Sequence, residues 1–334
     1  MESGEHDPEE LHYIRDVFNY QTKAINSILK NETTENLKEI ASLLQLYWVK
    51  NGKEFRDSDW NARFRLQFRN NPLHVAAEAG KVNCMKILLN TGAFDINDRD
   101  KHGKTVLHHA CGSVGYGLAT LEGSIASTKF LLDIAEEYGL DLNAETNHYP
   151  KMGAFHLAVH HFELAKLFIE HPISRKVDFN ALTGEGWNSY MLACEYGKPE
   201  LVKLLLEISK SRGIQLNLRD NWGRSALHLT SSREANAAIV LKFILENVQK
   251  YGIEVNLLDD QDRTFLQRAV HSCLSIEKRC EMVKVTLEHA NEVGLDLNNR
   301  DYEGETAWDF VQKHSFYAPI AALFNNVNKR KCPF

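Results

Sequence analysis

The chain has 334 residues, of which 43% are hydrophobic and 25% charged, and its formal net charge is −6. This length and apolar content can bury a large core, and the mild negative charge argues against nucleic acid as a main ligand, because phosphate binding needs concentrated positive charge. No stretch approaches the ~18 apolar residues of a membrane-spanning helix, so no membrane association is expected. The six cysteines form no CxxC pair, so we expect reduced thiols in an intracellular protein.

Residues 1–58 are predicted to form a helical cap or a degenerate repeat. Asp7 and Pro8, followed by two glutamates, make a favourable helix start, and apolar residues recur at helical spacing from Leu11 to Ile28. A second helical stripe follows over residues 37–48. Stacked repeats need end units that hide the core on one side, and this helix pair would serve that purpose.

From residue 59 onward, a short motif recurs in which an acidic or amide residue and an apolar residue precede an asparagine. It includes the string GLDLN, which occurs at 139–143 and again at 294–298. The seven copies of the motif are 59–61, 95–97, 141–143, 178–180, 215–217, 254–256 and 296–298. Regular recurrence of this kind is typical of stacked supersecondary units.

A fixed pattern follows each copy. Eleven or thirteen residues after its apolar residue stands another large apolar residue, and two residues before that stands a favoured helix N-cap type. These N-cap candidates are Asn71, Thr105, Gly153, Asn188, Ser225, Thr264 and Thr306. A second helix then follows, and four of these helices are expected to stop at Gly139, Gly213, Gly252 and Gly294. The string GLDLN is therefore interpreted as a helix stop followed by a hairpin stem.

These residues resemble the ankyrin repeat over residues 59–325. The segments NPLHVAAEAG, KTVLHHAC, GAFHLAV, NSYMLACEYG and RSALHLT match its T-P-L-H-x-A core, and DKHGKT, DNWGRS and DYEGET match its turn. The histidine of the core becomes Met191, Gln267 and Asp309 in three copies, and Asp262 replaces the turn glycine in the sixth. The resemblance implies an all-α solenoid of about seven helix-pair repeats with an N-terminal helical cap, and it leaves residues 326–334 as a basic tail.

Extra length lies within the helix pairs, because the turn and the first helix must stack on their neighbours. The largest insertion, at 112–127, lacks the lysine of a phosphate-binding loop, so we expect a flexible surface loop there.

Fifteen histidines invite a metal or catalytic interpretation. Four of them, His74, His108, His156 and His228, occupy the histidine position of the repeat, where a structural hydrogen bond between adjacent turns is expected. No two pairs of His or Cys residues have the spacing that a zinc site requires, and no G-x-S-x-G or H-E-x-x-H motif occurs. We therefore expect no catalytic residues, no metal, no cofactor and no enzyme activity.

The resemblance implies that partner contacts fall on variable turn residues along a concave surface. The residues selected on this basis are Lys101, His102, Tyr149, Glu185, Trp187, Asn221, Trp222, Arg224, Arg263 and Tyr302. Trp187 and Trp222 stand out because tryptophan dominates interface hot spots, although each could instead pack on the adjacent turn. If they are hot spots, replacing both by alanine should leave thermal stability nearly intact.

The sequence therefore predicts a monomeric scaffold or adaptor that binds another protein, and neither nucleic acid nor membrane, in the cytoplasm and with a nuclear location left open. The alternative is an inhibitory ankyrin regulator that masks a transcription factor, which the repeat number and the acidic balance favour. Against this alternative, the segment ESGEHD lacks the paired serines of that family's degradation signal, and no acidic Pro/Ser/Thr-rich tail follows the repeats.

Overall fold

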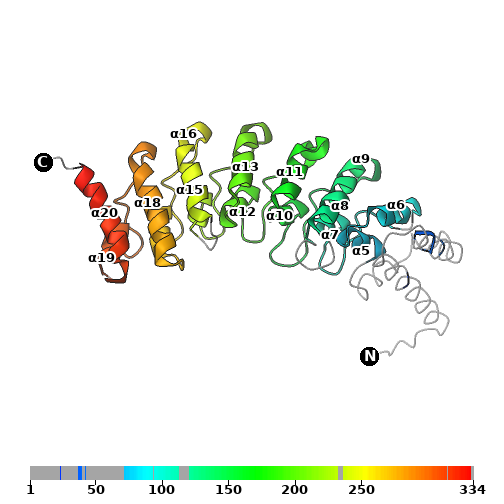
Figure 1. Cartoon of the computed structure of the whole chain (residues 1–334), viewed down its shortest axis with the longest axis horizontal. Helices are drawn as coiled ribbons and strands as arrows, with labels where there is room; N and C mark the ends of the chain where they lie inside the picture. The colour runs from blue at the N-terminus through cyan, green and yellow to red at the C-terminus, as the bar shows by residue number, and fades with distance from the viewer. Residues whose placement is uncertain are drawn as a thin grey trace, which may run out of the picture. The chain divides into compact units, whose positions relative to one another are not determined.

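The computed structural model describes residues 71–331 except 93, 113–119, 232–235 and 314, together with Lys23, residues 37–39 and Ser42 (Figure 1). This part of the chain is helical, with one isolated β-bridge between Glu145 and Gly153. None of its helices is both long enough and apolar enough to cross a membrane. The predicted cap at 1–58 lies almost entirely outside the described residues, and so does the first motif copy at 59–61.

The chain divides into two compact units, and the boundary between them runs through one helix, α11 (Phe162–Glu170). Unit 1 consists of residues 1–158 and 166–177, and unit 2 consists of residues 159–165 and 178–334. The remaining helices described in unit 1 are α5 (Pro72–Glu78), α6 (Val82–Asn90), α7 (Val106–Gly112), α8 (Leu121–Asp133), α9 (Ala135–Tyr138), α10 (Ala154–Ala158) and the 3-10 helix η1 (Pro172–Lys176). Those of unit 2 are α12 (Ser189–Glu195), α13 (Pro199–Arg212), α14 (Ala226–Leu229), α15 (Ala237–Glu246), α16 (Val248–Tyr251), α17 (Phe265–His271), α18 (Ile276–Val293), α19 (Ala307–Lys313), the 3-10 helix η2 (Ser315–Tyr317) and α20 (Ala318–Lys331).

Each unit is a stack of helix pairs. In unit 2 the short first helices α12, α14, α17 and α19 pack in one row, and the longer second helices α13, α15, α18 and α20 pack in another (Figure 1). In unit 1, α5, α7 and α10 form the first-helix row, while α6 and α8 pack against α5. The core lies between the rows, where side chains such as Leu107 and Leu131 in unit 1 and Tyr190 and Phe265 in unit 2 are fully buried.

The first helices begin at the predicted N-cap residues. Asn71 and Asn188 each accept a hydrogen bond from the backbone N–H three residues ahead. Ser225 and Thr264 form capping boxes, in which the side chain of the third helical residue reaches back to the cap. These caps satisfy N–H groups that a helix of only one or two turns cannot satisfy itself.

The predicted helix stops are also confirmed. Gly139, Gly213, Gly252 and Gly294 are C-caps in the left-handed conformation, with φ between 64° and 70°. A Cβ atom added at any of them would meet no other atom within 4 Å. The positive φ, and not the space around it, is therefore the reason for glycine at these positions.

The asparagine of the repeated motif joins each repeat to the next. Asn217 donates from Nδ2 to the carbonyl oxygen of Gly252 (2.9 Å), and its Oδ1 accepts from the N–H of Glu254 (2.9 Å). The same pair of bonds runs from Asn97 to residues 139 and 141, from Asn180 to 213 and 215, and from Asn256 to 294 and 296. The motif is therefore a side-chain clip that holds the helix stop of the following repeat, a role that the sequence pattern did not reveal.

Removing one clip should loosen unit 2. We expect Asn217→Ala to lower the free energy of unfolding by about 1–2 kcal/mol, because two backbone groups lose their protein partner and gain water instead. Chemical denaturation followed by circular dichroism measures this change.

Asn298→Ala is the matched control, since the amide of Asn298 makes no such bond within the described residues. Its effect should stay below about 0.5 kcal/mol. Equal losses in the two variants would contradict the clip.

Candidate functional site

A buried side chain at the start of each turn shapes the loops between stem and first helix. In the turn at 220–224, Asp220 Oδ1 accepts from the N–H groups of Trp222 (2.9 Å) and Arg224 (2.8 Å). Asp100, Asp259 and Asp301 make the same pair of bonds in their own turns, and Thr183 does so through its hydroxyl. We refer to the segments 100–104 and 146–152 of unit 1, and 183–187, 220–224, 259–263 and 301–305 of unit 2, as the turn tips.

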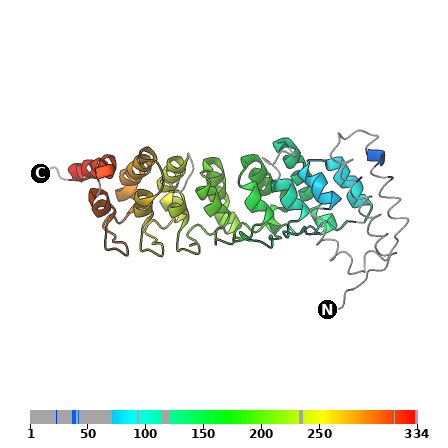
Figure 2. The ribbon, with the colours of Figure 1, turned by 90° about the horizontal axis from the view of Figure 1, so that it is seen from below.

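Backbone hydrogen bonds link neighbouring tips into a row. In unit 2 the N–H of Asn221 donates to the carbonyl of Glu185 (3.2 Å), that of Asp260 to Trp222 (3.0 Å), and that of Tyr302 to Gln261 (3.1 Å). In unit 1, Asn147 donates likewise to His102 (2.8 Å). The loops of unit 2 project to the same side of its helices (Figure 2). The exposed side chains of successive turn tips are therefore held next to one another on one surface of the unit.

Close approach of the following tip, together with a positive φ, explains the turn glycines at 103, 186 and 223. At Gly223, φ is +72°, and an added Cβ would lie 2.3 Å from Asp260 Oδ1 and 2.8 Å from the Asp260 nitrogen. Asp262 occupies the equivalent position of the next tip and keeps the same left-handed conformation, with φ 54°. Aspartate tolerates this conformation better than most residues but less well than glycine.

The two tryptophans singled out in the sequence meet the same arginine. The guanidinium of Arg224 lies 4.6 Å from the ring centroid of Trp222 and 5.6 Å from that of Trp187. Asp220 Oδ2 fixes this group, since it accepts from Arg224 Nε (2.7 Å) and from the indole N–H of Trp187 (2.8 Å). Trp187 is half-buried against the adjacent turn, whereas Trp222 is 46% exposed. Packing on the adjacent turn, one of the two alternatives left open by the sequence, thus holds for Trp187, and the hot-spot prediction remains open for the exposed Trp222.

A second arginine–aromatic pair joins the next two tips, at 259–263 and 301–305. Arg263 Nε lies 3.2 Å from Asp301 Oδ2, and its guanidinium lies 5.4 Å from the ring centroid of Tyr302. Tyr302 is 59% exposed. Arg268 of α17 pairs with the remaining buried carboxylate, Asp259 (3.4 Å). Arginine stacks on aromatic faces more readily than lysine does, and each of the two arginines is also paired with a buried aspartate.

The selected residues fall in both units. Glu185, Trp187, Asn221, Trp222, Arg224, Arg263 and Tyr302 lie together in the tip row of unit 2. Lys101, His102 and Tyr149 lie in unit 1, where the rings of His102 and His148 meet edge to face at 5.4 Å. Sequence reasoning missed the buried aspartates, although an aspartate opens each of the turn segments DKHGKT, DNWGRS and DYEGET.

A family model for ankyrin repeats, which holds three copies of the repeat, matches residues 33–141 and 117–220, together more than half of the chain. The chain belongs to the ankyrin repeat family. Ankyrin repeats bind other proteins, and this fold is generally a non-enzymatic interaction module.

Two curated relatives share part of this chain. The human transient receptor potential cation channel subfamily A member 1 is 25% identical over 228 residues, which cover 66% of this chain and 18% of that protein. The mouse B-cell lymphoma 3 protein homolog is 30% identical over 168 residues, which cover 49% of this chain and 33% of that protein. The chain thus spans about a third or less of the length of either relative.

Two solved structures share the fold. The ankyrin repeat domain of Bcl-3, described as a unique member of the IkappaB protein family, superposes with a TM-score of 0.56 at 19% identity, over 77% of this chain and 98% of that one. The human ASB11 ankyrin repeat domain gives a TM-score of 0.53 at 19% identity, over 76% and 98%. At this identity the likeness shows the ankyrin fold alone.

The histidine position of the ankyrin repeat links adjacent turns, as predicted, at His74, His108 and His228. His74, His108 and His228 each use Nε2 to bond a carbonyl oxygen of the following repeat, at 2.9–3.0 Å. Gln267 makes the equivalent bonds from Nε2 to the carbonyls of Asn299 and Glu305. Burial disfavours the imidazolium form and lowers the pKa of His74 to about 3 and that of His108 to about 4.

A buried charge cluster forms around His109, which follows His108 directly in the sequence. His109 contacts Asp100 Oδ2 (3.2 Å) and Glu78 Oε2 (3.4 Å), and it stacks on His74 at 4.8 Å between centroids. Burial alone would lower the pKa of His109, but the hydrogen bonds to the two carboxylates outweigh it and raise the pKa. Burial would raise the pKa of Asp100, but its bond to His109 and its backbone donors lower it to about 2. Across the described residues, no group of three or more His, Cys, Asp or Glu side chains is arranged to hold a metal ion.

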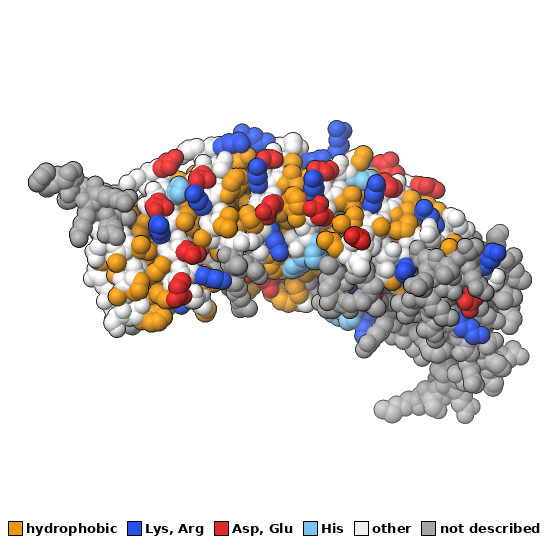
Figure 3. Space-filling model, viewed as in Figure 1, with side chains coloured by type: hydrophobic (Ala, Val, Ile, Leu, Met, Phe, Trp, Pro, Cys, Tyr) orange, Lys and Arg blue, Asp and Glu red, His pale blue; other side chains and the backbone are white. Residues whose placement is uncertain are grey.

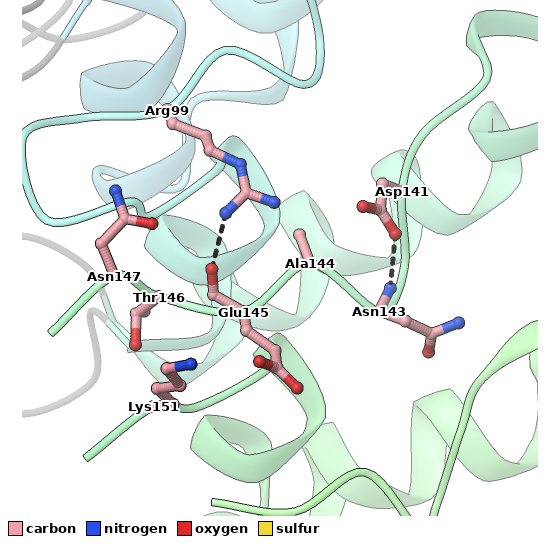
Figure 4. Close-up of a pocket in the computed structure, with 8 residues that line it drawn as sticks. All are labelled: Arg99, Asp141, Asn143, Ala144, Glu145, Thr146, Asn147 and Lys151. Carbon is pink, nitrogen blue, oxygen red and sulfur yellow. Dashed lines mark hydrogen bonds between the residues drawn. The ribbon is translucent and has the colours of Figure 1, made fainter. Parts of the chain in front are cut away.

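An open polar hollow of about 400 Å³ lies beside the stems of unit 1 (Figure 4). Its lining residues are Arg99, Asp141, Asn143, Ala144, Glu145, Thr146, Asn147 and Lys151. Arg99 donates to the backbone carbonyl of Glu145 (2.6 Å), so this cation already has a partner. Charges of both signs line the hollow, and it therefore selects neither anions nor cations.

The buried histidines should make the fold sensitive to acid. Because the pKa of His108 is lower in the folded state than its ordinary value of 6.5, the stabilisation is present above pH 6.5 and is lost as pH falls from 6.5 toward 4. By pH 4 this loss is about 3 kcal/mol. We expect His108→Gln to keep the hydrogen bonds, as Gln267 does, and to show a smaller loss of stability over this range.

Denaturation midpoints measured at several pH values between 7 and 4.5 test this expectation. His102→Gln, at an exposed position outside this set of turn-linking bonds, is the control and should keep the wild-type dependence. An unchanged pH dependence in His108→Gln would show that this histidine does not set the acid response.

Proposed function

We propose that this ankyrin repeat protein is a non-enzymatic adaptor that binds another protein through the turn tips of unit 2, with Trp222 and Arg224 at the centre of the contact. The observation that carries the proposal is an exposed tryptophan held in place by a buried ion pair. Tryptophan and arginine are the residues that most often dominate binding energy at protein interfaces.

The geometry favours binding because the contact residues are already ordered. Arg224 donates from Nε to Asp220 Oδ2, and its second guanidinium contact to the same oxygen is also 2.7 Å long; Arg224 in turn lies over the ring of Trp222. Association normally costs side-chain entropy, about 0.5–1.5 kcal/mol for each flexible side chain that becomes fixed. A pair that the fold has already fixed avoids much of this cost.

The exposed area of Trp222 also supports a role outside the fold. Its side chain is 46% exposed, and the described residues give the indole no hydrogen bond. The indole of Trp187, in contrast, donates to the buried carboxylate of Asp220. The fold thus depends on Trp187 for a hydrogen bond and on Trp222 for little.

Trp222→Ala should separate binding from folding. We expect it to change the free energy of unfolding by less than about 1 kcal/mol, because the side chain is exposed. The same change should weaken partner binding by at least ~2 kcal/mol. Proximity labelling in the native cell identifies the partner, and titration calorimetry with purified proteins then measures the affinity.

Ile239→Ala is the control, since Ile239 is 57% exposed on α15, outside the tip row. It should leave both quantities unchanged. A partner that binds wild type and Trp222→Ala equally well would refute the proposed surface. Trp187→Ala cannot replace this test, because it removes the hydrogen-bond donor to Asp220 and is expected to destabilise unit 2. Replacing Trp187 and Trp222 together is therefore now expected to lower thermal stability.

The likeness to the B-cell lymphoma 3 protein homolog supports a second candidate function, that of an inhibitory regulator that masks a transcription factor. The sequence match covers 49% of this chain at 30% identity. Under this proposal a bound transcription factor would leave the nucleus when the chain is present. Imaging of the identified partner with and without the chain distinguishes a masking regulator from an adaptor, which would leave the distribution unchanged.

A further inference from the structure

The turn tips of unit 2 carry an excess of negative charge. These four tips contain eight carboxylates and two arginines. Three of the carboxylates, Asp220, Asp259 and Asp301, are buried and paired with arginines, as described above. The other five carboxylates make the surface of the tips negative. Of these five, Asp260, Asp262 and Glu303 are exposed.

This excess is confined to the tips. In unit 1, the tip at 100–104 has two lysines and one aspartate, and the tip at 146–152 has one lysine and no carboxylate. The second helices of unit 2 carry both signs, for example in the ion pair of Lys242 with Glu246 (3.8 Å), and Figure 3 shows positive and negative side chains interspersed over them. The net charge of the whole chain therefore does not explain the acidic row.

Asp262 is the most informative of these residues, because the fold gains little from it. It adopts φ 54° at a position that glycine holds in the tips at 103, 186, 223 and 304. Within the described residues, its carboxylate makes no hydrogen bond or ion pair, and it follows Asp259 and Asp260 in the same turn. A backbone conformation that disfavours side chains, combined with repulsion between like charges, indicates a residue placed for recognition.

The other two carboxylates are accessible although each has a local contact. Asp260 lies 3.7 Å from Arg219, with 62% of its side chain exposed, and Glu303 accepts a hydrogen bond from the hydroxyl of Tyr302. Exposed ion pairs of this kind contribute at most ~1 kcal/mol, so a stronger cationic ligand can replace the contact with Arg219.

Aromatic faces lie among these carboxylates along the linked row. Trp222 and Tyr302 are the exposed large apolar residues of these four tips, and the tip at 259–263 stands between them. Each ring already has an arginine of this chain beside it, Arg224 and Arg263 respectively. The surface therefore displays the two groups that bind lysine and arginine side chains: carboxylates for the cation and aromatic faces for the cation and its methylene stem.

We propose that the tip row of unit 2 binds an extended, Lys/Arg-rich segment of the partner protein. The proposal rests on the proposed function and names the chemistry of its ligand. An extended segment fits because the acidic and aromatic groups repeat from tip to tip along a line, and successive residues of an extended chain advance by ~3.3 Å along such a line.

Fluorescence anisotropy with the full chain tests the proposal directly. The probe is a fluorescein-labelled decapeptide in which Lys-Arg pairs alternate with alanine. We expect the triple variant Asp260→Asn, Asp262→Asn, Glu303→Gln to bind this peptide at least tenfold more weakly than wild type, with the difference shrinking as salt rises. Asparagine tolerates positive φ, so the variant should keep its fold, which circular dichroism verifies.

The matched control removes three carboxylates from exposed positions on the second helices of unit 2. It is Glu207→Gln, Glu288→Gln, Glu292→Gln, which gives the same change in net charge. We expect a change of less than twofold in peptide affinity. Equal weakening by both triples, no weakening by either, or equal binding of a Glu/Asp-rich decapeptide would overturn the proposal.

Two further outcomes point to other conclusions. If the chain self-associates in sedimentation experiments and the Asp260/Asp262/Glu303 variant abolishes this, the acidic row binds a second copy of the chain, and the proposal of a partner segment is overturned. If Trp222→Ala weakens the cellular partner while the acidic triple affects neither that partner nor the peptide, the adaptor function stands and the basic segment is refuted. If Trp222→Ala affects no partner, the proposed function itself fails.

Discussion

The buried aspartate that opens four of the six turn tips is the interaction on which both the repeat and its surface depend. One oxygen of Asp220 accepts two backbone N–H groups of its own turn, and the other binds Arg224 and the indole of Trp187 from the preceding turn. A buried carboxylate is stable only when such donors surround it, because burying an unpaired charge costs several kcal/mol. The same requirement that shapes the loop therefore also fixes the side chains that the loop presents to solvent.

Two sets of side-chain bonds connect repeats at opposite ends of the stem. The motif asparagines hold the helix stop of the next repeat, and the histidines or Gln267 hold the carbonyls of the next turn. Because each bond crosses from one repeat to its neighbour, stability within a unit is largely a property of interfaces between repeats, as in other stacked architectures. This arrangement leaves the tips free to vary in charge and aromatic content without loss of the stack.

At the histidine position of the repeat, the residue that forms the turn-linking hydrogen bond also decides whether stability depends on pH. His108 and Gln267 make equivalent bonds, but only the imidazole can take up a proton, and burial lowers its pKa to about 4. In unit 1 the cluster of His109 with Asp100 and Glu78 acts in the opposite direction, since a protonated His109 is stabilised there. The two effects have opposite signs: acid lowers the stability of the fold through the histidines that are buried in the neutral form, whereas protonated His109 keeps its contacts with the two carboxylates.

The sequence by itself determined the repeat, its phase, and the residues at which its helices begin and end. Helix caps and stops depend on neighbours within a few residues, as at Asn71, Thr264 and Gly213. Because they recur in register, each one can be recognised from the sequence. Only the tertiary structure decided which tryptophan is packed and which is exposed, and what the motif asparagines do. Trp187 meets Asp220 across 33 positions, and Asn217 meets Gly252 across 35. Such contacts arise only when repeats stack, and spacing within one repeat carries no information about them.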